Sequence, residues 1–177
     1  DDPRGGGFLW NQRMLGHQGI SNQVWMDSGD STKHKGAYVP VEVQGQAYDA
    51  LLSAAELLEQ DPGPAGMRAE ETLDATRGLR ARAEDLRKAF FEAFAVEVDG
   101  KFEMFAHTIQ FKRIPRSKDR KDDVDRSTWC KSNQGRLLDS RLFDTDDPNI
   151  LKMRDKVIER LFQPDMSRTA SSTPLAR

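Results

Sequence analysis

The chain has 177 residues, of which 37% are hydrophobic and 32% charged, and this suits one folded domain with its own core. Its 27 basic and 29 acidic residues are mixed along the chain and give a net charge of −2, which excludes a general electrostatic surface for nucleic acid or anionic lipid. One cysteine allows no internal disulfide, and no apolar run is long enough to span a membrane. We therefore expect a cytoplasmic protein with no nucleic-acid partner, no membrane partner and no cofactor.

The first forty residues predict irregular structure. Three consecutive glycines, Gly5 to Gly7, make a regular element costly, so residues 1–21 are expected to form a loop or a short broken helix. Residues 22–41 are polar, with few apolar positions, which is typical of a long loop that carries function.

Two amphipathic helices follow. The first helix ends at Asp61-Pro62-Gly63-Pro64, because proline and glycine stop a helix. The second is expected from about Met67 to Phe94, with charged residues on its other faces, as in a helix on the outside of a bundle. The apolar positions at helical spacing are Val43, Ala47, Leu51, Ala54 and Leu58 in the first helix, and Leu73, Leu79, Ala83, Leu86, Phe90 and Phe94 in the second.

The second half of the chain predicts a β-hairpin, a charged loop and a last helix. Residues 96–102 contain an Asp-Gly pair, which favours a tight hairpin turn, and a strand is expected from Phe105 to Phe111. Residues 112–128 are almost all charged and indicate a mobile insertion. The last helix has Asp147 as its cap and Pro148 at its first position, with Ile150, Met153, Val157 and Leu161 facing inward.

One polar segment has the composition of half a glycosidase site. Glycoside hydrolysis needs a carboxylic acid that protonates the leaving oxygen and a second carboxylate on the other face of the sugar. Either Asp27 or Asp30 is a candidate for the acid, and Trp25 offers a flat apolar wall on which a sugar ring can stack. Glu42 lies at a predicted helix start, where the helix dipole favours negative charge. The alternative is that these acids are ordinary helix caps and turn residues.

Three segments resemble the glycogen-debranching (amylo-α-1,6-glucosidase) type of glycoside hydrolase. That family has a Trp-x-Asp-Ser segment, then Val-Glu-Val-Gln-Gly-Tyr-x-Tyr-x-Ala, and later Ser-Asn-Pro-Gly-His-Leu-Leu. The corresponding segments here are residues 22–31 (NQVWMDSGDS), 40–50 (PVEVQGQAYDA) and 131–138 (KSNQGRLL). They occur in the family's order, and the resemblance covers about residues 22–166.

The resemblance implies a mainly α fold that is part of an (α/α)6 toroid, with a small β-hairpin insertion. Residues 1–177 would then form part of the catalytic domain of an inverting α-glucosidase. Within it we expect a motif loop and inner helix at 22–60, an outer helix and hairpin at 67–111, a charged loop at 112–128 and a helix at 147–162.

The resemblance also implies roles for individual residues. Asp27 matches the family's general acid, with Asp30 as the second choice. The implied substrate-binding residues are Trp25, Asp30, Glu42, Gln44 and Asn133.

The chain departs from the family pattern at three positions. Gln46 replaces a tyrosine, Gln134 replaces a proline and Arg136 replaces a histidine, which puts sugar contacts by residues 131–138 in doubt. The three histidines do not have metal-ligand spacing, so no metal site is expected.

The family's general base follows a His-x-Gly-x-x-Trp-Pro segment, and no such segment is present here. A toroid also needs twelve helices, and this sequence predicts three or four. We therefore expect a fragment that carries the general-acid half of the site, is inactive alone, and has the rest of the toroid and an oligosaccharide or small α-glucoside as partners. The alternative is a non-catalytic helical module that binds sugars or other partners.

Overall fold

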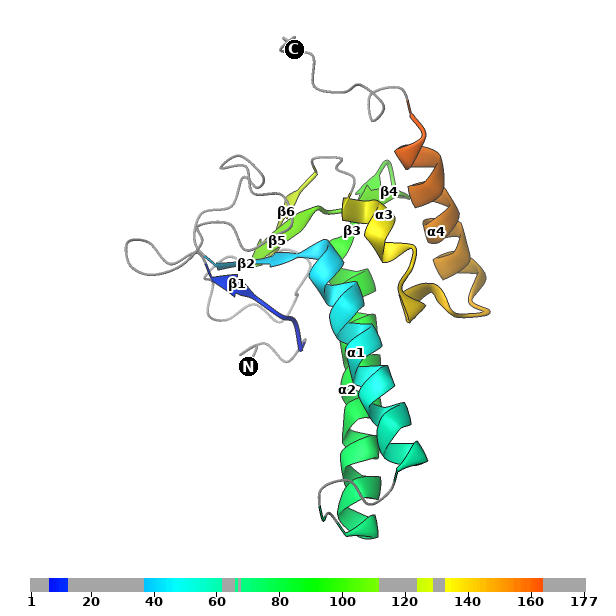
Figure 1. Cartoon of the computed structure of the whole chain (residues 1–177). Coiled ribbons are helices and arrows are strands. Elements are labelled where there is room, and N and C mark those ends of the chain that lie inside the picture. The colour runs from blue at the N-terminus through cyan, green and yellow to red at the C-terminus, as the bar shows by residue number, and fades with distance from the viewer. Residues whose placement is uncertain are drawn as a thin grey trace.

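A computed structural model describes residues 7–12, 37–61, 66, 68–111, 124–128 and 133–163 of the chain. Two long helices are joined into a hairpin, and shorter helices follow near the C-terminal end (Figure 1). The helices are α1 (Val41–Gln60), α2 (Ala69–Phe94), α3 (Asn133–Leu137) and α4 (Pro148–Leu161), with a 3-10 turn, η2 (Arg141–Phe143), between the last two.

The strands form two small antiparallel sheets. The larger sheet has the order β1-β2-β5-β6, and the smaller one pairs β3 with β4. In the larger sheet Pro40 lies opposite Thr108, and Thr108 lies opposite Ser127. The strands are β1 (Asn11–Gln12), β2 (Ala37–Pro40), β3 (Ala95–Val98), β4 (Lys101–Phe105), β5 (Thr108–Phe111) and β6 (Val124–Ser127).

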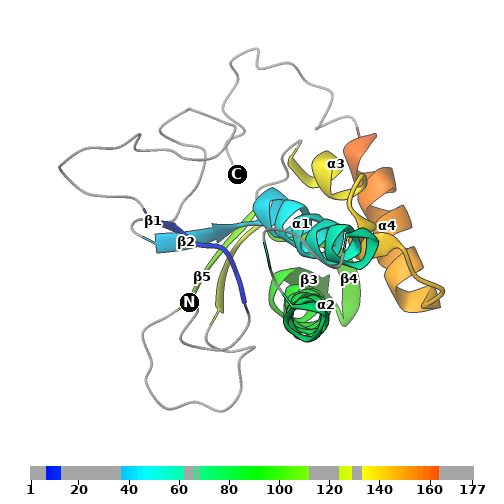
Figure 2. The ribbon, with the colours of Figure 1, turned by 60° about the horizontal axis from the view of Figure 1, so that its bottom comes forward.

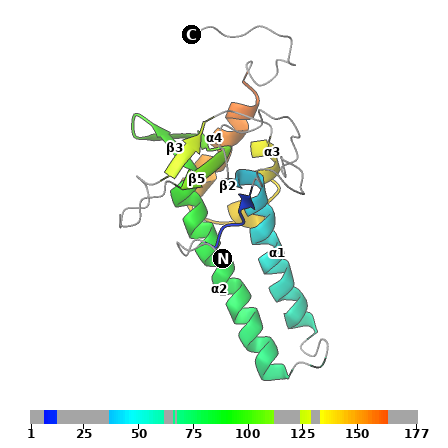
Figure 3. The same cartoon turned by 90° about the vertical axis from the view of Figure 1, so that its left-hand side faces the viewer.

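The outer half of the α1–α2 hairpin extends away from the rest of the described chain (Figure 3). Small residues, among them Ala55 and Thr76, are buried along this part and let the two helices approach closely. Glu59 and Arg80 join the helices at the surface through two hydrogen bonds of 3.0 and 2.8 Å. We call residues 57–60 and 68–80 the arm.

The core lies where the other half of the hairpin meets both sheets and the C-terminal helices. Phenylalanine rings fill it, with Phe90 stacked on Phe94 at 4.9 Å and Phe102 tilted against Phe105 at 4.8 Å. Phe105 also touches Phe143 of η2, so one ring joins the β-hairpin to the C-terminal part of the chain. The larger sheet lies on one side of the hairpin, and α3 and α4 lie on the other (Figure 2).

Two local predictions are confirmed. The β3–β4 hairpin turns at Asp99 and Gly100, which have φ values of 52° and 72°, as a tight hairpin turn with two positive φ angles requires. Asp147 caps α4, since its side chain accepts a hydrogen bond of 2.8 Å from the backbone N–H of Asn149.

The prediction of a six-hairpin (α/α)6 toroid arc is wrong. In the described residues the only pair of long helices is α1–α2, and two antiparallel sheets pack beside it. The physical reason is that residues 37–40 and 124–127 pair with β5 as strands, so much of the chain between the helices forms sheet. The helix after them, α3, has only five residues.

Other local predictions also need correction. Residues 37–40 lie in the segment expected to be a loop, yet they form β2. The predicted charged insertion contains β6, whose Val124 and Ser127 are buried. Leu73 was expected on the apolar stripe of the second helix but is 49% exposed. Strands β2 and β6 form because each pairs with β5, which is distant in sequence. Leu73 is exposed because no described element covers it.

Candidate functional site

Buried polar side chains concentrate at one place in the described chain. Of nine such side chains, Thr72 and Thr76 lie in α2, where each hydroxyl bonds to its own helix. The other seven lie around the first turns of α1, the larger sheet and the segment from α3 to η2. We call them the polar junction: Glu42, Gln44, His107, Thr108, Ser127, Gln134 and Ser140.

Backbone hydrogen bonds fix the ends of several elements at the polar junction. The N–H of Val41, at the start of α1, donates to the carbonyl of His107 at 3.1 Å. The N–H of His107 donates in turn to the carbonyl of Ser127 at 2.8 Å. The side-chain amide of Gln134 donates to the carbonyl of Phe105 at 2.8 Å, which joins α3 to the end of β4. The junction is therefore one connected unit.

Gln44 joins the N-terminal segment to α1. Its side-chain oxygen accepts from the N–H of Leu9 at 2.9 Å, and its amide nitrogen donates to the carbonyls of Leu9 at 2.9 Å and Pro40 at 3.0 Å. Both amide hydrogens are therefore used by backbone groups. The structure gives Gln44 a positioning role, since it holds residue 9 against the start of the helix.

Gly45 lets α3 and the following turn approach α1 closely. A Cβ atom at this position would lie 3.2 Å from a methyl group of Leu137 and 3.2 Å from Cβ of Ser140. The Ser140 hydroxyl donates to the carbonyl of Gly45, also at 3.2 Å. Residues 40–50 and 133–138, which belong to two of the resembling segments, are thus packed against each other.

The remaining predicted site residues divide into two groups. Glu42 is 5% exposed and lies in the first turn of α1, where the helix dipole favours negative charge. Asn133 is the first residue of α3. Trp25, Asp27 and Asp30 lie outside the described residues. The segment that contains them is bounded by β1 and β2, and these two strands pair with each other.

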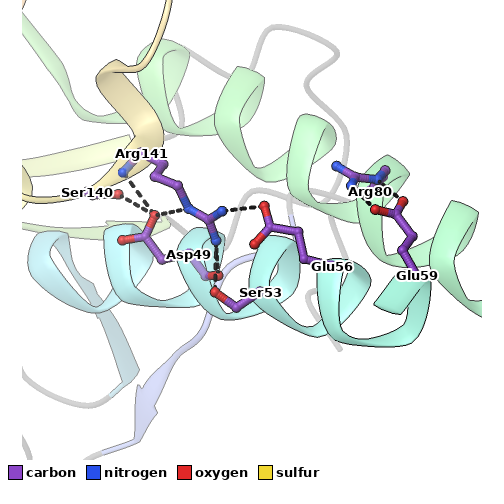
Figure 4. A network of polar contacts seen from close by, with 7 residues as sticks. All are labelled: Asp49, Ser53, Glu56, Glu59, Arg80, Ser140 and Arg141. Carbon is purple, nitrogen blue, oxygen red and sulfur yellow. Dashed lines mark hydrogen bonds and ion pairs between the residues drawn. The ribbon is translucent and has the colours of Figure 1, made fainter. Parts of the chain in front are cut away.

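Sequence reasoning missed a polar network on the side of α1, which Figure 4 shows. The Arg141 guanidinium donates to Glu56 at 2.6 Å and to the Ser53 hydroxyl at 2.8 Å. One carboxylate oxygen of Asp49 accepts from the Arg141 N–H at 2.9 Å and from the Ser140 hydroxyl at 3.2 Å. A signal was present, because residues 49, 53 and 56 have the spacing of one helix face.

A depression of about 410 Å³ opens next to this network. Its volume lies within the range of roughly 300–1,000 Å³ that is usual for ligand sites. The lining side chains are Gln46, Asp49, Arg136, Asp139 and Ser140. None of them was among the predicted site residues, because they lie on two segments about ninety residues apart.

Two carboxyl groups and one tyrosine hydroxyl of the described chain have clearly shifted pKa values. Hydrogen bonds from Arg80 and Arg68 lower the pKa values of Glu59 and Glu71, which keeps both groups ionised. Burial raises the pKa of Tyr48, so its hydroxyl stays neutral at pH 7. The described residues also contain no group of three His, Cys, Asp or Glu side chains that is able to hold a metal ion.

The described helices include none with both the length and the apolar character needed to cross a membrane. The described chain is therefore an α-helical hairpin with two small sheets, and the polar junction lies at the root of the hairpin. Comparison of the chain with protein-family models, curated proteins and solved structures gave no match.

Proposed function

We propose that this chain carries the general-acid half of a glycoside hydrolase site that acts on α-glucosides. In this proposal Asp27 protonates the glycosidic oxygen, Trp25 stacks against the sugar ring, and Asp30, Glu42 and Asn133 contact its hydroxyls. Gln44, the other residue that the resemblance assigns to substrate, acts by holding the start of α1 in place.

The observation that supports the proposal is the packing of two of the three resembling segments at the root of the hairpin. Gly45 lies against Leu137 and Ser140, which joins residues 40–50 to residues 133–138 and the turn that follows. The third segment is bounded by β1 and β2, and β2 leads directly into α1. Buried polar groups are costly unless they are paired, and the paired groups here hold these two segments in a fixed position relative to each other, as a site built from both segments needs.

The chemistry needs one step from this chain. As the bond between C1 and the glycosidic oxygen breaks, the Asp27 carboxyl gives its proton to that oxygen and the alcohol leaves. A nucleophile then forms a bond to C1 from the opposite face. The family pattern provides a base for this nucleophile downstream of the segments found here, so the chain alone is expected to lack efficient hydrolysis.

The role of Asp27 as the general acid can be tested in the 177-residue chain by adding an external nucleophile. Isomaltose has a poor leaving group that needs protonation, and sodium azide replaces the water that a base would activate. We expect azide-dependent formation of β-glucosyl azide and glucose, measured by chromatography and NMR. Asp27→Asn should lower this rate about 10²- to 10⁴-fold, the usual contribution of a general acid.

Asp30→Asn is the matched control, because it removes a neighbouring carboxylate of the same segment. Because Asp30 is assigned a contact to the sugar hydroxyls, its loss should raise KM for isomaltose and lower the azide-dependent rate at saturating isomaltose less than about tenfold. Equal rates for the wild type and Asp27→Asn, or a loss confined to Asp30→Asn, would contradict the assignment of the acid. Absence of azide-dependent product in the wild type would contradict a catalytic role for this chain.

A second candidate is a module that binds sugars without cutting them. The observation that favours it is the depression beside α1, which is lined by hydrogen-bonding side chains within the described residues alone. Sugar binding without azide-dependent turnover would support this module, whereas turnover that depends on Asp27 would exclude it.

A further inference from the structure

The depression beside α1 combines three kinds of hydrogen-bonding group. Gln46 and Asp49 come from α1, Arg136 comes from α3, and Asp139 and Ser140 come from the turn after α3. An amide donates and accepts, carboxylates accept, and a guanidinium donates. This mixture matches a ligand whose own groups both donate and accept.

Several of these groups keep hydrogen-bonding capacity. Asp49 uses one carboxylate oxygen for Ser140 and Arg141, and its other oxygen has no partner among the described residues (Figure 4). The side chains of Gln46 and Asp139 likewise make no hydrogen bond within the described part of the chain, and both are exposed. The depression therefore has an amide and two carboxylates available to a ligand.

The charges limit the class of ligand. The lining contains two carboxylates and one guanidinium, and the Arg141 guanidinium lies 3.7 Å from Asp49, so these charges largely balance and give a phosphate or carboxylate ligand no net attraction. A cation would meet Arg136. A neutral molecule with neighbouring hydroxyls satisfies all of the groups, because each hydroxyl donates to a carboxylate and accepts from an amide or guanidinium.

We propose that this depression binds one neutral sugar unit through its hydroxyls. The inference rests on the proposed function for the substrate class, and it adds a subsite that lies on α1 and the segment after α3. Asp49 is held by Ser140 and the Arg141 backbone, which fixes the direction of its available oxygen.

Two of the three departures from the family pattern line this depression. Gln46 stands where the family has tyrosine, and Arg136 stands where it has histidine. The third departure, Gln134, is buried and bonds to the carbonyl of Phe105. Gln46 and Arg136 are far apart in sequence, and both line this depression.

Titration of the ¹⁵N-labelled 177-residue chain with D-glucose tests the subsite. We expect saturable shifts of the backbone amides at 46, 49 and 141, and the last of these donates to Asp49. Asp139→Ala should weaken glucose affinity about tenfold or more and Gln46→Ala about two- to tenfold, since hydrogen bonds to charged groups contribute more than those between neutral groups. Both are exposed positions, where alanine is well tolerated.

Asp85→Ala is the matched control, because it removes an exposed carboxylate from α2 away from the depression, and it should leave glucose affinity unchanged. The subsite would be overturned by absence of saturable shifts, by unchanged affinity in both test variants, or by inorganic phosphate binding the same amides as tightly as glucose.

The test of the sugar subsite and the test of Asp27 as the acid can fail independently of each other. Asp27→Asn should keep full glucose affinity while it loses azide-dependent turnover. Turnover that depends on Asp27, together with unchanged affinity in Gln46→Ala and Asp139→Ala, would overturn the subsite alone. Glucose binding that depends on Gln46 and Asp139, without any turnover, would overturn the acid role alone.

Discussion

The arm and the polar junction are two ends of the same helical hairpin, and different interactions stabilise them. In the arm, polar contacts are local or join facing helices, such as Arg68 with Glu71 and Arg80 with Glu59. At the junction they cover long sequence separations, 35 residues for Leu9 and Gln44 and 95 for Ser140 and Gly45. Local contacts cost little loop-closure entropy, whereas the junction requires most of the chain to be in place.

This difference indicates where substitutions should matter. Arm contacts are exposed and easily replaced by water, so losing one should change little. Junction contacts are buried or part-buried, and breaking one leaves a backbone group with restricted access to water. Matched substitutions at the two ends should therefore differ in their effect on stability.

The largest effect is expected for Gln44→Ala. The substitution removes three hydrogen bonds and leaves the backbone groups of Leu9 and the carbonyl of Pro40 without the side-chain partner. We expect the free energy of unfolding to fall by about 1–3 kcal/mol, because the buried Pro40 carbonyl loses its side-chain partner, whereas the Leu9 groups are part-buried and can bond to water. Urea denaturation followed by circular dichroism measures this change.

Gln46→Ala controls for the loss of a glutamine from the same helix. Gln46 is exposed and makes no hydrogen bond in the described part of the chain, so the change should stay within about 0.5 kcal/mol. Equal stability losses in the two variants would show that Gln44 does not hold the junction together.

The two ends also differ in how well the sequence predicts them. The helical spacing from Val43 to Leu58 predicts α1, which begins two residues earlier, at Val41, and Asp147 marks the start of α4. These signals are local. The strands β2 and β6 were missed because their buried faces depend on pairing with β5, which no short window of the sequence reveals.

The candidate site shows the same limit. Glu42 and Gln44 were identified from a short motif, and both are buried at the junction. The structural use of Gln44 depends on Leu9, and the depression depends on α3 meeting α1. The sequence therefore identified residue types suited to sugar chemistry, but which of them meet follows from contacts between distant segments.

Replacing glycine by alanine should change the free energy of unfolding in opposite directions at the two ends of the hairpin. At Gly45 the new Cβ would press on Leu137 and on Ser140, whose hydroxyl is already held by hydrogen bonds. Crowding destabilises the fold by about 1–3 kcal/mol, and the higher helix propensity of alanine stabilises it by about 1 kcal/mol. We therefore expect the free energy of unfolding to fall by roughly 1 kcal/mol. At Gly78 in α2 nothing lies within 4 Å, so alanine should stabilise by about 0.5–1 kcal/mol.

Thermal and urea denaturation of both variants measure the signs. Stabilisation by Gly45→Ala would mean that α3 and the turn move away without cost, which would contradict a tightly packed junction. Destabilisation by Gly78→Ala would contradict an open surface on that face of the arm.

The smallest effect concerns the pH dependence of the arm. Hydrogen bonds from Arg80 lower the pKa of Glu59 below its ordinary value of 4.5 in the folded chain. A group with a lowered folded pKa contributes stability above the unfolded pKa and loses it as the pH falls through the folded pKa. The stability difference between the wild type and Glu59→Gln should therefore be present at pH 7 and disappear below pH 4.5.

Salt provides a second check on the same pair. Both side chains are nearly half exposed, at 47% for Glu59 and 44% for Arg80, so added salt should reduce their attraction at pH 7. The effect of Gln44→Ala should be nearly independent of salt, because it involves neutral buried groups. If the Glu59→Gln difference persisted in high salt and at low pH, the ion pair would not be its source, and the arm would depend on packing alone.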